Sequence, residues 1–283
     1  MPIESGTLYI IATPIGNLGD MTARARQLLR EADYVLAEDT RNSRRLLTHF
    51  GIEARLSALH EHNESERIRQ CLAWLRDGLD LALICDAGTP LVNDPGYRLV
   101  AAARQNGVTV SPVPGACSPI AALSVSGLPT DRFVYEGFLP AKAKACGERL
   151  QALETERRTL VFLEASHRIE DTLHTFSKAW PDRRLVLAKE LTKIHEAVVS
   201  GAARQILDWL NADPGRVKGE FVLMAAGAEP APQPTEGVHP DTLLRLLLEE
   251  LPASKAAKLA ARITGLERKT LYRRALSMPR SVD

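Results

Sequence analysis

The sequence predicts an α/β protein with two α/β domains followed by a small helical tail. Short apolar runs alternate with segments of helical periodicity, which is the pattern of crossover units and a largely parallel sheet. Two interruptions divide the chain, Pro112-Val113-Pro114-Gly115 and the proline-rich segment Ala228–His239. A length of 283 residues leaves room for more than one hydrophobic core. We therefore expect domains over residues 1–113 and 114–228, a linker over 229–240 and a basic helical tail over 241–283.

The first domain is predicted from four apolar runs of strand length, separated by helical patterns. The strands are Leu8–Ala12, Tyr34–Ala37, Leu81–Cys85 and Val108–Ser111, and the helices are Thr22–Arg30, Glu66–Arg76 and Pro95–Asn106. For the last helix, Asp94 is the expected N-cap, Pro95 suits the first helical position, and Gly107 supplies the C-terminal stop.

The second domain is predicted to restart with a helix over Ile120–Val125. Ser118 is the expected N-cap of this helix, and Pro119 lies in its first turn. The remaining pattern predicts strands over Phe133–Gly137, Thr159–Glu164, Leu185–Ala188 and Phe221–Ala225, with helices over Ile169–Ala179 and Ala203–Leu210.

The segment Leu83–Tyr97, which reads LICDAGTPLVNDPGY, is the best indication of a ligand site. Its first half is a buried strand that runs into the small residues Ala87, Gly88 and Thr89, where bare backbone can approach a ligand. Open α/β sheets bind ligands at the carboxyl ends of their strands. The alternative is a tight strand-to-helix turn that binds nothing.

Composition and charge exclude several classes of protein. The chain has 45% hydrophobic and 25% charged residues, as globular proteins do, and no apolar run approaches the roughly 18 residues that span a membrane. The net charge of +1 excludes a globally basic protein, so any nucleic-acid surface must be local. The four cysteines form no C-x-x-C pair, which argues against a zinc site or a disulfide framework. Since the N-terminus has no secretory signal, we expect a cytoplasmic protein with no bound metal and no membrane partner.

Seven segments, in order, resemble the tetrapyrrole methylase family, and within it the branch that methylates ribosomal RNA. They are TLYIIATPIGNLGDMTARA (Thr7–Ala25), ADYVLAEDTRNSRRLL (Ala32–Leu47), DAGTPLVNDPGYRLV, PVPGACSPIAALSVSGLP, FLEASHRIEDTL, KELTKIHE and KGEFVLMAAG. The resemblance runs from Thr7 to Gly227 and continues into the tail. It implies two α/β domains with S-adenosylmethionine in the cleft between them, and a homodimer. It also implies methyl transfer to the 2′-hydroxyl of a cytidine in small-subunit ribosomal RNA, so the expected partner is that RNA or the small ribosomal subunit.

The chain departs from the broader family at two loops. Tetrapyrrole enzymes usually carry Gly-Asp-Pro after the third strand, where this chain has Gly88-Thr89-Pro90. The matching N-terminal loop, Thr13-Pro14-Ile15-Gly16-Asn17, differs as well. Both changes fit the RNA-methylating branch and lower the expectation of a porphyrinoid substrate. The resemblance therefore carries over to the cofactor side better than to the substrate side.

Cofactor contacts are expected from three places. Gly88 and Thr89 can supply backbone donors and a hydroxyl, whereas Asp94 either contacts the cofactor or only caps a helix. The helix after the domain break would direct backbone N–H groups toward a carboxylate. Two strand ends offer an adenine slot, or else are simple core. The full set is Pro14, Gly88, Thr89, Asp94, Ala116, Cys117, Ser118, Phe162, Leu163, Met224 and Ala225.

Catalytic and phosphate-binding candidates follow the second and sixth predicted strands. Methyl transfer is an in-line displacement that depends mainly on positioning, with a nearby base to take the hydroxyl proton. The candidates are Glu38, Asp39 and Arg41, with His167 near neutrality as a further proton acceptor. Arg41, Arg44 and Arg45 are suited to phosphate. The alternatives are a capped helix with solvated arginines and a structural histidine. Lys189, Glu190, Lys193, His195 and Glu196 form a third polar group, either an ion-pair network or part of the site.

The tail is strongly basic. Between Ala253 and Arg280 it has eight lysines and arginines against the single acid Glu267, a net charge of +7. Localised positive charge of this kind indicates contacts with phosphate backbones. Ala261, Gly265 and Leu271 fall at helix-turn-helix offsets, although a basic hairpin that packs on the body is the alternative. The expected RNA contacts here are Lys255, Lys258, Arg262, Arg268, Lys269, Arg273 and Arg274.

Three functions therefore compete. The leading one is a ribosomal RNA ribose methyltransferase that uses S-adenosylmethionine. A small-molecule tetrapyrrole methylase is the second, and the basic tail and the missing Gly-Asp-Pro count against it. The third is a non-enzymatic DNA-binding regulator built around the C-terminal helices, which would not need a long α/β body.

Overall fold

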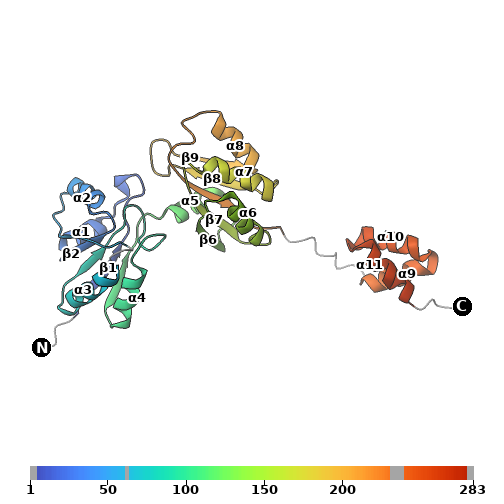
Figure 1. Ribbon diagram of the computed structural model, residues 1–283, viewed down its shortest axis with the longest axis horizontal. Helices are drawn as coiled ribbons and strands as arrows, with labels where there is room; N and C mark the ends of the chain where they lie inside the picture. Colours follow the sequence, from blue (N-terminus) through green and yellow to red (C-terminus); the bar gives the residue numbers. More distant parts are fainter. Residues whose placement is uncertain (1–4, 61–63, 230–238, 279–283) are drawn as a thin grey trace. The chain divides into compact units, whose positions relative to one another are not determined.

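The computed structural model describes residues 5–60, 64–229 and 239–278. The chain forms two compact units, residues 1–228 and 229–283, whose elements are labelled in Figure 1. The first unit holds two five-stranded sheets. This confirms the predicted α/β class, while the exact boundary of the two domains within the first unit stays a prediction.

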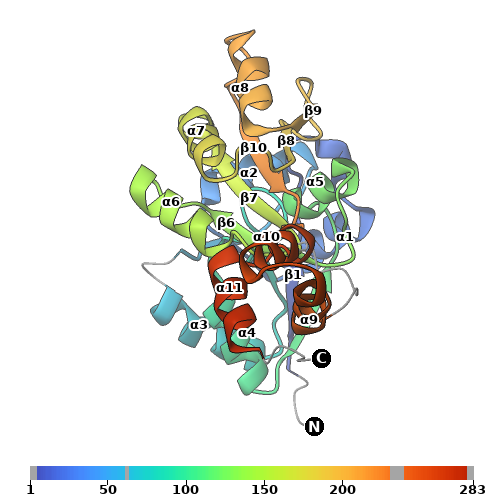
Figure 2. The same ribbon diagram turned by 90° about the vertical axis from the view of Figure 1, so that its right-hand side faces the viewer.

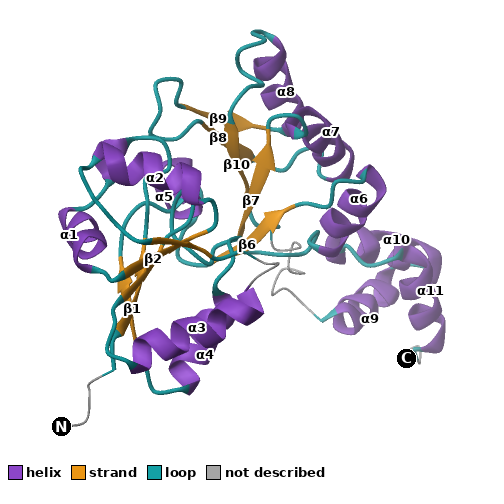
Figure 3. Ribbon diagram, turned by 60° about the vertical axis from the view of Figure 1, so that its left-hand side comes forward, coloured by secondary structure: helices purple, strands orange, loops and turns teal. Residues whose placement is uncertain are grey.

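The first sheet is entirely parallel, in the order β3-β2-β4-β1-β5. Its strands are β1 (Thr7–Ile11), β2 (Tyr34–Ala37), β3 (Leu56–Ala58), β4 (Leu81–Leu83) and β5 (Thr109–Val113). The short helix η1 (Leu18–Asp20) and the helices α1 (Ala23–Glu31) and α2 (Thr40–His49) follow β1 and β2; α3 (Glu64–Arg76) and α4 (Tyr97–Gln105) precede and follow β4. Figure 3 shows α1 and α2 on one side of this sheet and α3 and α4 on the other. Both faces are buried, which explains why its strands are continuous apolar runs.

The second sheet is mixed, in the order β6-β7-β10-β8-β9. Its strands are β6 (Phe133–Phe138), β7 (Thr159–Ala165), β8 (Leu185–Lys189), β9 (Ala197–Gly201) and β10 (Glu220–Ala225). The parallel sheet predicted from the alternating strands and helices of the first half is confirmed there, whereas in this half only the β6–β7 pair is parallel. The reason is that β10 inserts between β7 and β8 and that a short loop joins β8 to β9, which permits antiparallel pairing.

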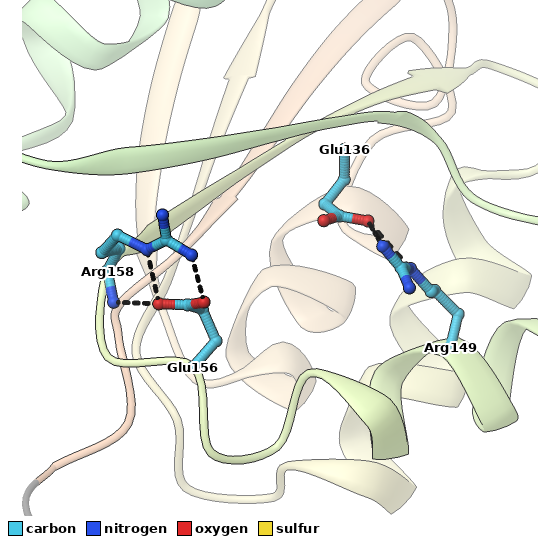
Figure 4. A network of polar contacts seen from close by, with 4 residues as sticks. All are labelled: Glu136, Arg149, Glu156 and Arg158. Carbon is cyan, nitrogen blue, oxygen red and sulfur yellow. Dashed lines mark hydrogen bonds and ion pairs between the residues drawn. The ribbon is translucent and has the colours of Figure 1, made fainter.

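Helices cover both faces of the second sheet as well. The helix α5 (Ser118–Ser126) packs on one face, and α6 (Ala143–Ala152), α7 (Ile169–Ala179) and α8 (Ala203–Asn211) pack on the other. Two ion pairs lie near β6 and the start of β7 (Figure 4). Arg149 of α6 donates to Glu136 of β6 at 2.8 Å, and Arg158 donates to Glu156 at 2.6 Å just before β7. The Arg158 hydrogen bonds hold the pKa of Glu156 at about 2.

Three local predictions need correction. The strand β5 continues past Ser111 to Val113, because Pro112 lies on an edge strand, where a missing N–H is tolerated. The helix α4 begins at Tyr97, after Gly96 at φ 119°, so Asp94 is not its N-cap and Pro95 is not its first residue. The carboxyl of Asp94 contacts the Cys85 thiol instead. The N-cap of α5 is Cys117, with extended backbone, and Ser118 is the first helical residue.

The second unit is helical, as predicted (Figure 2). It contains α9 (Pro240–Glu250), α10 (Ala253–Thr264) and α11 (Arg268–Ser277), which pack around Leu244, Ala257, Ala260, Leu271 and Ala275. Gly265 ends α10 in the left-handed conformation, at φ 73°, as a turn between two helices requires. Residues 230–238 of the expected linker, and Arg280, lie outside the described residues. Within the described ranges, no helix is long and apolar enough to cross a membrane.

Candidate cofactor and substrate site

A cavity of about 270 Å³ lies between loops of the first sheet and one end of the second sheet. The first half of the unit contributes Ile15 after β1 and Ala87 after β4, and Ser118 comes from the start of α5, which packs on the second sheet. The second half contributes Phe138, Leu163, Glu164, Ala165, Ala188, Leu191, Glu220, Phe221 and Val222. The walls are mostly apolar, with one hydroxyl and two carboxylates. Such a cavity suits a ligand with a flat apolar part and a charged part.

The loops after β1 and β4 are joined by one threonine. The Thr13 N–H donates to the Gly88 carbonyl at 2.8 Å, and the Gly88 N–H donates back at 3.1 Å. The buried Thr13 hydroxyl also donates to the Cys85 carbonyl at 3.1 Å. Thr89 connects this loop to the segment before α5, because its hydroxyl donates to the Ala116 carbonyl at 3.0 Å. The predicted residues Gly88, Thr89 and Ala116 are thus brought together.

Gly88 takes a conformation that favours glycine, with φ at +86°. A Cβ at this position would lie 3.3 Å from Ile15 Cγ2 and 3.7 Å from the Ala116 carbonyl oxygen. Ile15 is itself a wall of the cavity. A side chain at this position would therefore press on a wall of the cavity.

Asp94 lies beside this loop rather than in the cavity. Burial raises the pKa of its carboxyl, and the nearby Asp86 raises that pKa further, while contact with the Cys85 thiol opposes the shift. Burial and Asp94 together raise the pKa of the Cys85 thiol, whose Sγ also contacts the Gly88 carbonyl oxygen at 3.3 Å. Asp94 therefore packs against the strand that leads into the loop.

The helix α5 starts at the cavity. Ser118 lines it, and the first-turn N–H groups of α5 have no acceptor within the helix. Cys117 is the N-cap but makes no side-chain cap bond. An anionic group would be stabilised at this helix end.

The expected adenine slot is only partly in place. Leu163 lines the cavity, but its neighbour Phe162 points to the opposite face of β7, where its ring packs edge-on against Phe176 at 5.6 Å. Met224 and Ala225 are fully buried in core clusters. Pro14 is buried next to Ile15, and among the described residues it is Ile15 that reaches the cavity. Alternation along β7 explains why only one of two adjacent predicted residues can line the cavity.

Sequence reasoning missed most of the walls of the cavity, among them three large apolar side chains. Phe138 ends β6, Leu191 begins the loop after β8, and Val222 lies in β10. Leu191 belongs to the KELTKIHE segment, so that motif was the available signal. The position of Phe138 depends on a bulge in β6 that has no sequence signature other than Gly137.

The polar residues after β2 lie next to the loop after β4. Asp39 is the N-cap of α2, where its Oδ1 accepts from the N–H groups of Arg41 at 2.7 Å and Asn42 at 3.4 Å. The Asn42 amide donates to Asp86 at 3.1 Å and so links the two motifs. Glu38 is exposed at the end of β2. Arg41, Arg44 and Arg45 are exposed along α2 and border a surface hollow with Thr48 and His49.

The polar residues after β7 and those after β8 lie in different surroundings. His167 is exposed in the turn between β7 and α7, outside the cavity. Glu164 lines the cavity, and its carboxylate accepts from the Thr172 hydroxyl at 2.6 Å and pairs with Arg168 at 3.2 Å. Lys193 pairs with Glu190 at 2.9 Å and with Glu220 at 3.1 Å. Although burial alone would lower it, these carboxylates raise the pKa of Lys193. The third group is therefore an ion-pair network.

The Lys193 side chain also lies on the backbone of Gly16, where an added Cβ would collide with it. This places the loop after β8 directly against the loop after β1. Both loops contribute a neighbouring residue to the cavity, Leu191 and Ile15. The network thus supports one side of the cavity.

The basic residues of the tail are exposed. All seven predicted contacts, Lys255, Lys258, Arg262, Arg268, Lys269, Arg273 and Arg274, have exposed positions on or next to α10 and α11. Arg274 also lies 3.4 Å from Asp241. The second unit therefore presents a cationic surface.

Comparison with known proteins identifies the first unit. Residues 7–207 match the profile of the tetrapyrrole (corrin/porphyrin) methylases. The chain belongs to the tetrapyrrole methylase family. A second profile, the RsmI C-terminal HTH domain, matches residues 235–279, which include the three helices of the second unit.

Within the family, the chain is similar along nearly its whole length to ribosomal RNA small subunit methyltransferases I. It is 50% identical to that protein of Pseudomonas aeruginosa, over 97% of this chain and 98% of the relative. It is 52% identical to that of Xylella fastidiosa, over 94% and 98%.

Solved structures of other family members share the fold. A cobalt precorrin-4 methyltransferase of cobalamin biosynthesis aligns with a TM-score of 0.57 at 20% identity, over 78% of this chain and 94% of that one. A diphthine synthase aligns with a TM-score of 0.60 at 16% identity, over 78% and 90%. A Thermus thermophilus uroporphyrin-III C-methyltransferase was solved with S-adenosyl homocysteine. It aligns with a TM-score of 0.52 at 21% identity, over 78% of this chain and 97% of that one.

The described residues contain no cluster of His, Cys, Asp and Glu suited to a metal ion.

Proposed function

We propose that this protein transfers a methyl group from S-adenosylmethionine to the 2′-hydroxyl of a cytidine in small-subunit ribosomal RNA. The observation that carries the proposal is near-full-length similarity, at about half identical residues, to ribosomal RNA small subunit methyltransferases that include the basic tail. The tetrapyrrole enzymes with solved structures match only the body, at identities that establish the fold alone.

The cavity residues fit S-adenosylmethionine. The first-turn backbone N–H groups of Ser118 and Ile120 in α5 suit its carboxylate. The apolar walls formed by Ile15, Leu163 and Val222 suit its adenine ring. The bare backbone at Gly88 leaves the space that a Cβ would take. When bound, S-adenosylmethionine supplies a methyl group activated by its sulfonium charge.

The protein contributes mainly position and exclusion of water. The doubly bonded Thr13–Gly88 pair fixes one wall of the cavity, and the Lys193 network supports another. Glu38 and His167 are the proposed acceptors of the hydroxyl proton, since both are exposed where strands β2 and β7 end. Asp39 acts through Arg41, because its carboxylate fixes the first turn of α2.

Two surfaces bind the RNA. Arg41, Arg44 and Arg45 on α2 are exposed and suited to bidentate phosphate contacts. The seven exposed cations of the tail add charge that the nearly neutral chain lacks elsewhere. Because the partner is ribosomal RNA or the small subunit, the protein works in the cytoplasm.

The active species is a homodimer. The helix α5 exposes the apolar side chains of Ile120 and Val125, which are 51% and 52% exposed. The neighbouring strand β9 exposes Val198 at the edge of the second sheet. A second copy of the chain that covered this surface would remove these side chains from water. Sedimentation of the purified protein tests this point, with a monomer at micromolar concentration as the contradicting result.

A methyl-transfer assay tests the proposal as a whole. Purified protein is incubated with isotope-labelled S-adenosylmethionine and one substrate in each of three reactions. The three substrates are small ribosomal subunits, protein-free small-subunit RNA and uroporphyrinogen. We expect label in RNA. Label in the porphyrinoid, with none in RNA, would contradict the proposal.

A further inference from the structure

A side-chain hydrogen bond connects the loop after β4 to the second sheet. The Tyr135 hydroxyl of β6 donates to Asn93 Oδ1 at 2.7 Å. Asn93 lies between the Gly88 loop and α4, in the first half of the unit, and Tyr135 lies in the second half. The two residues are 42 positions apart in the chain, so the bond is a tertiary contact.

The segment that carries Asn93 is strained. Leu91 and Asn93 both have positive φ, at 73° and 69°, and neither is glycine. Such conformations are unfavourable for residues other than glycine and persist where neighbouring structure over-determines them. The segment is also tied to the Gly88 loop. The Val92 N–H donates to the Thr89 carbonyl at 3.4 Å, and the Thr89 hydroxyl donates to the Ala116 carbonyl.

The second sheet is shaped to receive Asn93. The β6–β7 pairing shifts register between Tyr135 and Gly137, which bends β6. Gly137 has φ at +66°, and a Cβ there would lie 3.1 Å from both side-chain polar atoms of Asn93. The Asn93 amide therefore lies directly on bare backbone at the bulge. Phe138, the next residue, is a wall of the cavity.

Tyr135 can donate throughout the physiological pH range. Burial raises its pKa to about 12, and the neighbouring Cys117 and Asp94 contribute to the shift. The ring packs against the core between the second sheet and α5. The phenol is thus a fixed neutral donor rather than a proton acceptor.

We infer that Asn93 and Tyr135 form a strut that holds the Ala87–Thr89 loop and Phe138 at the spacing required for cofactor binding. The inference rests on the proposed function, because it assigns the cavity to S-adenosylmethionine. Tyr135 is accordingly a positioning residue that acts through Asn93 and need not touch the cofactor. The strain at Asn93 is maintained by the contact and is released when the contact is removed.

The test combines two measurements on wild type, Tyr135→Phe, Asn93→Gly and the double variant. The first is amide hydrogen exchange at Gly88 and Val92 without ligand, and the second is calorimetric titration with S-adenosylmethionine. Tyr97→Phe is the matched control, because Tyr97 is 74% exposed on the neighbouring helix α4. Thermal unfolding of every variant is measured alongside.

We expect faster exchange at both amides and about threefold to tenfold weaker cofactor binding in each single variant, as for loss of one hydrogen bond. The double variant should be no worse than either single one, because both remove the same contact. Asn93→Gly should unfold at or above the wild-type temperature, because glycine adopts a positive φ without strain. If Asn93 only stabilised the fold, its replacement would lower the unfolding temperature.

Unchanged exchange and unchanged affinity in both single variants would overturn the strut. So would additive losses in the double variant. If wild type itself failed to bind S-adenosylmethionine, the proposed function would be wrong, and the exchange measurement would still decide whether the strut exists.

Discussion

Thr13 and Gly88 donate backbone hydrogen bonds to each other, at 2.8 and 3.1 Å, across the ends of the neighbouring strands β1 and β4. This reciprocal pair joins the two loops in which the chain departs from the broader family. Ile15 and Ala87, next to the pair, both line the cavity that we propose for the cofactor.

Replacing Gly88 with valine should abolish measurable cofactor binding while the chain still folds. The new side chain would press on Ile15, and a β-branched residue at φ +86° is strained by about 1–2 kcal/mol. Gly107→Val is the matched control, because Gly107 has φ +73° with nothing within 4 Å of its Cβ position. Calorimetry should show binding by the control and none by Gly88→Val; equal affinities would refute the assignment of the cavity.

Arg41→Ala should lower kcat/KM for RNA by about tenfold and leave the affinity for S-adenosylmethionine within about twofold, because one phosphate contact is lost. Arg104→Ala, at an exposed arginine on α4 across the sheet, should change neither. Steady-state kinetics with varied RNA and cofactor measures both quantities. Parallel loss of cofactor affinity would show that Arg41 is not on the substrate side.

Asp39→Ala should likewise reduce methyl transfer more than cofactor affinity, and should also destabilise α2 by about 1 kcal/mol through loss of its N-cap. Asp39→Ser keeps a capping oxygen, so it should recover most of both losses if Asp39 acts by fixing Arg41. Urea unfolding and the same kinetics measure these effects. A stable Asp39→Ser variant as inactive as Asp39→Ala would instead give the carboxylate a direct role.

Gly16→Ala should weaken cofactor binding, because the added Cβ collides with the aliphatic part of Lys193 and must displace the loop after β8. In a Lys193→Ala background the same glycine substitution should have a smaller effect, since the colliding atoms are gone and only the strain of a Cβ at φ +156° is left. Titration of the four chains with S-adenosylmethionine checks this coupling. Independent, additive losses would mean that the two loops do not support the cavity together.

A chain that ends at Pro234 should fold and bind S-adenosylmethionine but methylate RNA poorly. The tail forms its own compact unit, and its cations would no longer reach phosphate. Each such contact releases counterions, so the affinity of the full-length protein for RNA should fall more steeply with salt than that of the truncated chain. Equal slopes over a salt series would make the tail a packing or dimerisation element.

The parallel first sheet was predictable because strands buried on both faces leave continuous apolar runs, such as Leu81–Leu83. The short strand β3 was missed because Leu56, Ser57 and Ala58 carry no such run, and its place at the sheet edge comes from pairing with β2. The mixed order of the second sheet was missed for a related reason. The sequence of Glu220–Ala225 does not indicate that this strand lies between β7 and β8.

The site was predictable in its loops and not in its walls. Small residues at Ala87–Thr89 indicate close backbone approach, and Ala87 and Ser118 line the cavity, whereas the cofactor contacts expected at Gly88 and Ser118 stay predictions. Which side of a strand a residue faces depends on register, so Leu163 faces the cavity while Phe162 faces the core on the other side of β7. The prediction of Asp94 as a helix cap was wrong because Gly96, at φ 119°, is the residue that precedes the first turn of α4, so the helix begins three residues after Asp94.

The most direct test of the central claim is to identify the methylated product. Small ribosomal subunits that lack the modification are incubated with the protein and S-adenosylmethionine, and their RNA is digested to nucleosides and analysed by mass spectrometry. We expect one new species, 2′-O-methylcytidine, at no more than one per RNA molecule. A methyl group on a base, or on the ribose of another nucleoside, would contradict the proposed function.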